Sequence, residues 1–241
     1  MTRLLTLLLF CTTWLSQAQS FEGTLVYKAE YEISVSEKMK ANGITAEKII
    51  DRMKSDGSYI DTIRSTYKQG NYRTDMNAHP PTWAVYRNDA NKLYTFQDGE
   101  AKDICTVADM AIDLEFKLTG NKPVIAKLDT TATVGDIPCE VVRVKWKSGS
   151  YDYYFNKTKN PVDPAPYAKH VYDGWAGYLS ISKALPLKII KRAGKLSVVT
   201  MTLISQKGGP VDDALFKIPK LVEDKDLNII KMPGSEMMRI K

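Results

Sequence analysis

The alternation of apolar and polar residues is clearest between residues 131 and 155. Apolar side chains recur at every second position over 142–146 and again over 151–155, and the turn-forming residues Ser-Gly-Ser lie between them at 148–150. A period of two residues that is interrupted by a turn is typical of two paired strands with one buried face. The pattern therefore predicts a β-hairpin at this place.

The same alternation predicts strands along most of the chain. The first of them, at 21–33, has apolar residues at odd positions and polar residues at most even positions, so one face of it is expected to be buried. Clusters of Gly, Asn and Asp separate the later segments, as expected for a meander in which each strand pairs with the next. The further strand segments are 60–67, 72–76, 83–87, 92–96, 101–105, 123–128, 185–191 and 195–206.

Two stretches depart from the strand pattern. Residues 46–54 carry an apolar stripe at helical spacing, which predicts a helix that packs on the sheet. Residues 156–183 contain three prolines and two glycines, which forbid one continuous element. A long insertion of this kind in a sheet protein is either a lid over a cavity or a connecting loop. Together these features predict a mainly β (α+β) fold.

The beginning of the chain has the layout of a secretory signal peptide. A positive charge at Arg3 precedes an apolar run from Leu4 to Phe10, and small residues end at Ala18. The sequence predicts a signal peptide at 1–18, one β-rich domain at 19–241, and a periplasmic or extracellular protein. No later segment is apolar enough to predict a transmembrane helix.

Charge and motifs argue against several functional classes. The formal net charge of +6 comes from basic residues that are scattered among acidic ones, which is typical of a solvated surface and not of a nucleic-acid site. The two histidines, His79 and His170, lie in loop-like sequence without metal or nucleophile motifs, and exposed or loop-packing roles are expected for both. We therefore expect no enzyme activity, no metal site and no cofactor.

Cys105 and Cys139 are the two cysteines beyond the predicted signal peptide. In an oxidising compartment they form a candidate disulfide, which would stabilise the fold by about 3–4 kcal/mol in the chain-entropy model. The alternative is a pair of buried thiols, since spacing gives no distance between them.

Three short motifs carry a resemblance to a known group of proteins. They are Gly-Asp-Ile-Pro-Cys at 135–139, Leu-Pro-Leu-Lys-Ile at 185–189, and Val-Asp-Asp-Ala-Leu-Phe-Lys-Ile-Pro at 211–219. In this order they resemble uncharacterised secreted families of Gram-negative bacteria, which look like distant relatives of the LolA/LolB lipoprotein carriers. The resemblance implies a curved antiparallel sheet, a LolA-like half-barrel, with short helices against or over its concave face. It also implies a concavity that holds acyl chains, although a fold alone does not transfer an activity.

Aromatic residues supply the candidate ligand site. Side chains from the strands and from the Pro-rich insertion could line a pocket for an apolar ligand, or they could fill the core. The candidate cavity-lining residues are Trp83, Trp146, Tyr153, Phe155, Trp175 and Tyr178. We expect a non-catalytic binding protein for a lipid or a lipoprotein acyl chain. The alternatives are a cell-envelope module with a filled core that binds a protein or glycan partner, and, third, a hydrolase whose catalytic groups the sequence conceals.

Overall fold

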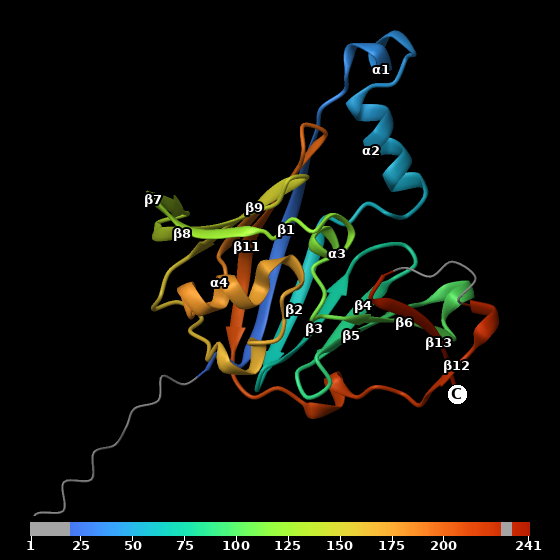
Figure 1. Cartoon of the computed structure of the whole chain (residues 1–241), viewed down its shortest axis with the longest axis vertical. Coiled ribbons are helices and arrows are strands. Elements are labelled where there is room, and N and C mark those ends of the chain that lie inside the picture. The colour runs from blue at the N-terminus through green and yellow to red at the C-terminus, as the bar shows by residue number, and fades with distance from the viewer. Residues whose placement is uncertain (1–19, 228–232) are drawn as a thin grey trace, which may run out of the picture.

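One curved, open antiparallel sheet of thirteen strands organises the computed structural model, which describes residues 20–227 and 233–241 (Figure 1). The predicted signal peptide at 1–18 lies outside the described residues. The strand order is β12-β13-β6-β5-β4-β3-β2-β1-β11-β10-β9-β8-β7, so β1 lies inside the sheet between β2 and β11. The strands are β1 (Gly23–Ile33), β2 (Thr62–Lys68), β3 (Asn71–Met76), β4 (Thr82–Arg87), β5 (Lys92–Gln97), β6 (Ile104–Asp109), β7 (Val124–Val134), β8 (Ile137–Lys145), β9 (Gly149–Phe155), β10 (Lys188–Ala193), β11 (Ser197–Gly208), β12 (Leu221–Glu223) and β13 (Ser235–Ile240).

Most of the predicted strands are confirmed with small changes of boundary, but the strand predicted at 101–105 begins only at Ile104, as β6, and η1 ends at Ala101. The hairpin at 131–155 is present as β8 and β9, with β7 added on its outer side. The meander from β2 to β6 pairs each strand with the next, as predicted. Strands β12 and β13 have no counterpart in the predicted pattern, and β13 pairs with β6.

Helices are few and short. Side chains cap the first three of them: Ser36, Thr45 and Asp113 each accept a hydrogen bond from a backbone N–H three residues later, which satisfies a donor that has no partner in the helix. The α-helices are α1 (Glu37–Ala41), α2 (Ala46–Ser55), α3 (Leu114–Thr119) and α4 (Trp175–Ser182). The 3-10 helices are η1 (Gly99–Ala101), η2 (Ala165–Tyr167), η3 (Tyr172–Gly174), η4 (Asp213–Phe216) and η5 (Lys225–Leu227).

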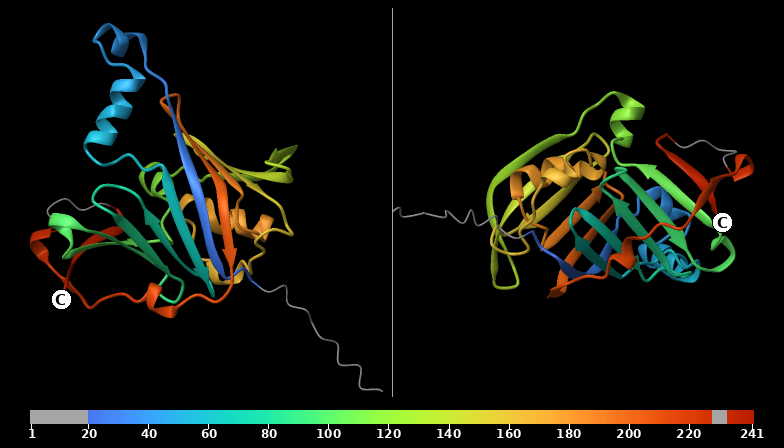
Figure 2. Two further views of the ribbon diagram at one scale, coloured as in Figure 1. Left: turned by 180° about the vertical axis from the view of Figure 1, so that it is seen from behind. Right: turned by 90° about the horizontal axis from the view of Figure 1, so that it is seen from below.

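Helix α2 has the predicted extent, but the prediction that it packs on the sheet is wrong. None of its residues is buried, and α1 and α2 project away from the sheet (Figures 1 and 2). The cause is the length of β1, which pairs with β2 only as far as Lys28 and continues beside β11 to Ile33. The chain therefore leaves β1 beyond the end of β2, and the helices that follow lie beyond the covered face.

The predicted insertion extends over 156–187, between β9 and β10, and covers the concave face of the sheet. Helix α4 lies inside the curve (Figure 2), and the Tyr178 ring stacks on Tyr153 of β9 with their centroids 4.4 Å apart. Gly174, at φ +67°, begins α4 so close to β8 that a Cβ there would lie 2.5 Å from Val144. The insertion is thus a packed part of the core and not a loose connection.

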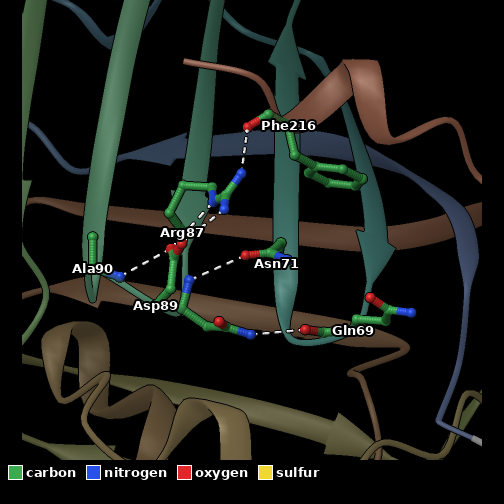
Figure 3. Close-up of polar contacts among 7 residues, drawn as sticks. Gln69, Asn71, Arg87, Asp89, Ala90 and Phe216 are labelled. Carbon is green, nitrogen blue, oxygen red and sulfur yellow. Dashed lines mark hydrogen bonds and ion pairs between the residues drawn. The ribbon is translucent and has the colours of Figure 1, made fainter.

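The C-terminal segment covers the opposite, convex face. Phe216 of η4 is buried there against Val85, Phe96, Cys105 and Val107. A polar contact fixes the same place: an Arg87 guanidinium N–H donates to the Phe216 carbonyl oxygen at 3.2 Å, while the rest of the guanidinium binds Asp89 (Figure 3). The segment therefore acts as a strap that closes a second, smaller core. Within residues 20–227 and 233–241, no helix is long and apolar enough to cross a membrane.

Replacement of Phe216 with alanine tests the strap. Truncation of a buried phenylalanine leaves a cavity in the convex core, so the variant should unfold with about 3–5 kcal/mol less free energy in chemical denaturation. The neighbouring Leu215 is 37% exposed, and Leu215→Ala should change the free energy by less than about 1 kcal/mol. Equal effects of the two substitutions would contradict this account of the strap.

Candidate functional site

A cavity of about 340 Å³ lies on the concave face, between the sheet and the segment that leads into α4. Its wall is mostly apolar and aromatic, with a few hydroxyl and charged groups. The lining residues are Tyr27, Ile63, Ser65, Tyr67, Tyr72, Thr74, Met76, Ala84, Leu93, Thr95, Tyr153, His170, Tyr172, Asp173, Trp175, Pro186, Ile189, Lys191 and Met201.

Strand register explains why the sheet is hollow at this point. Ser65, Thr74, Ala84 and Thr95 are direct neighbours across β2, β3, β4 and β5. All four side chains face the cavity and are small. We refer to these four residues as the small-residue row. Close packing leaves few voids in a protein interior, so a continuous row of short side chains under a fixed cover is a direct cause of a hollow.

A row of large side chains borders the small-residue row. Tyr67, Tyr72, Tyr86 and Leu93 are neighbours across the same four strands, one pleat further along. The rings of Tyr72 and Tyr86 stack at 5.0 Å. These side chains form a largely aromatic wall, since the three tyrosine rings pack in series and those of Tyr72 and Tyr86 also contact His170 of the insertion.

His170 closes this wall from the insertion. Its Nε2 lies 2.9 Å from the Tyr72 hydroxyl, and its ring lies 4.7 Å from that of Tyr86. Burial lowers the pKa of His170 to about 4, so the ring is neutral near neutral pH. Its Nδ1 is buried without a hydrogen-bond partner among the described residues, as is Nε1 of Trp175. Unpaired buried polar atoms are rare in native proteins, and two of them meet at this wall.

The charged end of the cavity is formed by Lys191 and Asp173. Lys191 Nζ lies 3.3 Å from Asp173 Oδ2 and 4.6 Å from the centre of the Tyr151 ring. Burial disfavours the ammonium, but the Asp173 carboxylate outweighs this and raises the pKa of Lys191. Asp173 itself is held at φ +57°, and its carbonyl oxygen accepts a hydrogen bond from the Tyr153 hydroxyl at 2.8 Å.

A second hollow of about 270 Å³ adjoins this end and shares Tyr172 and Asp173 with the cavity. It is more polar and contains Trp146, whose indole N–H donates to Asp113 Oδ2 at 2.7 Å. Apolar and polar compartments therefore meet at Asp173. Within the described ranges, no group of three or more His, Cys, Asp and Glu side chains could hold a metal ion.

The structure brings only two of the six predicted residues to the cavity. Tyr153 and Trp175 line it. Phe155 of β9 and Tyr178 of α4 are fully buried and belong to the core, which is the alternative role considered for these aromatic residues. Trp146 lines the adjacent polar hollow instead.

The prediction that Trp83 lines the cavity is wrong, because this residue lies on the convex face. Ala84 of the same strand faces the cavity, so the alternation along β4 turns Trp83 away from it. Its ring stacks on Phe96 at 5.6 Å and packs in the core beneath the strap.

The candidate disulfide between Cys105 and Cys139 is not formed. Both cysteines are free and buried, on β6 and β8, and the sheet order separates these strands by most of its width. Burial raises the pKa of Cys105 to about 12, so this residue stays a thiol. The alternative of two buried thiols describes the structure.

Most of the polar groups that line the cavity were not predicted from the sequence. His170 was expected in a loop and does lie in the insertion, but it is 3% exposed and packs against the sheet. Lys191 and Asp173 were not among the predicted site residues. The one usable signal was the alternation in β2 to β5, which puts Ser65, Thr74 and Thr95 on the face that also carries tyrosines, yet the register that aligns them is not visible in the sequence.

Comparison with known proteins gives no family for the chain. No family model and no curated protein matches it. Two crystal forms of PNGF-II are similar to it among solved structures, with TM-scores of 0.41 and 0.40 and 12% sequence identity. The similarity covers 80% and 81% of this chain but only 29% and 30% of that protein, so the chain spans less than a third of its length. A likeness this weak carries no argument about function.

The neutral state of His170 predicts a pH-dependent stability. Because its pKa is about 4 in the folded protein and about 6.5 in the unfolded chain, the unfolded state binds a proton first as the pH falls. The free energy of unfolding should therefore fall through this window, by about 2 kcal/mol between pH 7 and pH 5 from this group alone. His170→Phe should remove that part of the loss, as measured by denaturation at both pH values. An identical pH dependence in both proteins would contradict the assignment.

Proposed function

We propose that the chain is an extracytoplasmic, non-catalytic binding protein for an apolar ligand that lies in the concave cavity. The observation that carries the proposal is the hollow itself, which is bounded by the small-residue row, the tyrosine wall and the insertion. Concave, mostly apolar sites with a few placed polar groups are typical of small-molecule binding. Transfer of each methylene from water into such a site contributes about 0.8 kcal/mol, so binding needs no catalytic group.

The volume of the cavity limits the size of the ligand that can bind. Ligand sites are commonly about 300–1,000 Å³, and about 340 Å³ lies at the lower end of that range. Helix α4 and its neighbours fill the rest of the concavity with fully buried side chains, among them Phe155 and Leu179. We therefore propose a single acyl chain or a compact apolar molecule as the ligand. A lipoprotein with several acyl chains is too large for this volume.

Two features of the sequence support this proposal. The resemblance of the three short motifs to LolA/LolB-like carriers implies a carrier of acyl chains with a sheet of this kind. The predicted signal peptide at 1–18 implies a periplasmic or extracellular location, where exposed lipid chains need a carrier.

A partner-binding module of the cell envelope is the second candidate. The observation that favours it is the projecting arm of α1 and α2, which has no buried residue and stands clear of the sheet. An element that contributes nothing to the core is more readily explained by contact with another molecule. A hydrolase stays a third possibility without a supporting group of residues.

Analysis of bound lipid tests the proposal directly. We expect the chain, secreted to the periplasm and purified without detergent, to carry an apolar ligand at close to one molecule per protein. An organic extract analysed by mass spectrometry, beside a secreted protein of similar size, would identify it. A folded protein with no enriched species in the extract would favour the partner-binding candidate.

Filling the cavity should remove the ligand without loss of the fold. Ala84 belongs to the small-residue row and faces the hollow, so Ala84→Leu should add volume where there is space. We expect the variant to bind the fluorescent probe N-phenyl-1-naphthylamine at least about tenfold more weakly. Ala126→Leu makes the same change at an exposed position of β7 and should have no effect. Unchanged probe binding in a folded Ala84→Leu protein would contradict the assigned site.

A further inference from the structure

The charges that line the concave cavity cancel. Lys191 and Asp173 are its two charged side chains, and they form an ion pair at 3.3 Å. His170, the imidazole that lines the cavity, is buried in the neutral state. The cavity therefore has polar groups but no net charge to offer a ligand.

The polar groups that stay available are neutral. Ser65, Thr74 and Thr95 place three hydroxyl groups on the floor of the cavity, and the first two lie 3.2 Å apart. A hydroxyl can both donate and accept a hydrogen bond, so it suits an alcohol, an amide or an ester oxygen. An ionised carboxylate in the same place would be buried beside a lysine whose charge Asp173 already offsets. Burial of an ion without a counter-ion is strongly unfavourable.

We propose that Asp173 determines specificity, and that by neutralising Lys191 it makes the cavity select neutral amphiphiles over free carboxylates. This inference rests on the proposed function, because it concerns the ligand of the same cavity. Asp173 is well fixed for the role: its backbone lies in the left-handed region, and its carbonyl oxygen accepts a hydrogen bond from the hydroxyl of Tyr153 on β9. The carboxylate is thus held against Lys191 by the backbone and not by the ion pair alone.

A pair of ligands with the same chain tests the proposal. Decan-1-ol and decanoate compete with N-phenyl-1-naphthylamine for the purified full chain at about pH 8, where a carboxylic acid is ionised. We expect decan-1-ol to displace the probe at a concentration at least about tenfold lower than decanoate.

The variant Asp173→Asn provides a second test of the proposal. Asparagine also tolerates the left-handed conformation, so the backbone should stay in place while Lys191 loses its counter-ion. We expect binding of decanoate to tighten about tenfold relative to binding of decan-1-ol. Asp129→Asn, at an exposed position of β7, is the matched control and should change neither.

The outcomes separate this inference from the proposed function. Decanoate that binds the original protein as tightly as decan-1-ol overturns the inference but leaves the cavity as a ligand site. The same holds if Asp173→Asn, shown to be folded by circular dichroism, gains no affinity for decanoate. Failure of both ligands and of the probe to bind the folded original protein overturns the proposed function itself.

Discussion

An open antiparallel sheet has two faces, and each of them must be covered if both carry apolar side chains. In this chain the same strands alternate between the faces, so that Ala84 and Tyr86 point to the concave side while Trp83 and Val85 point to the convex side. Two segments from different parts of the chain supply the covers. The insertion at 156–187 covers the first face, and the strap around Phe216 covers the second. Removal of either would expose a large apolar surface to water.

The cavity exists because the insertion is held in place above the part of the sheet that carries only short side chains. Tyr27 and Tyr153 donate hydrogen bonds to carbonyl oxygens of the insertion, at Pro186 and Asp173, and both distances are 2.8 Å. These contacts, with the close approach of Gly174 to β8, keep the insertion at a fixed height. It cannot sink onto the small-residue row, so the space above Thr74 and Ala84 stays open. A core under selection for stability alone would fill that space, since larger apolar side chains there would add buried area.

The strands could be predicted from the sequence because their signal is local. Alternation along 21–33 or 142–155 needs only the residues themselves, and β1, β8 and β9 appear where it predicts them. The bounds of the helix at 46–54 could likewise be predicted from its own residues. Its packing could not, because it depends on where β1 leaves the sheet, and that is set by the pairing of β1 with its neighbours. The same limit applies to Trp83 and Trp146: an aromatic residue in a strand is easily predicted to be buried, while the face that buries it depends on register and on the covers.

The candidate site was the least predictable part for the same reason. Its floor consists of short side chains, which attract no attention in a sequence, and it becomes a floor only because four strands align them. Its charged end joins Asp173 of the insertion to Lys191 of β10, and neither residue is unusual alone.

The effect of these two groups on a ligand depends on their relative position. A lysine in an apolar cavity attracts anions if it is free, and it becomes part of a neutral polar wall if an aspartate is held beside it. The left-handed turn that presents Asp173 therefore decides what the cavity offers a ligand.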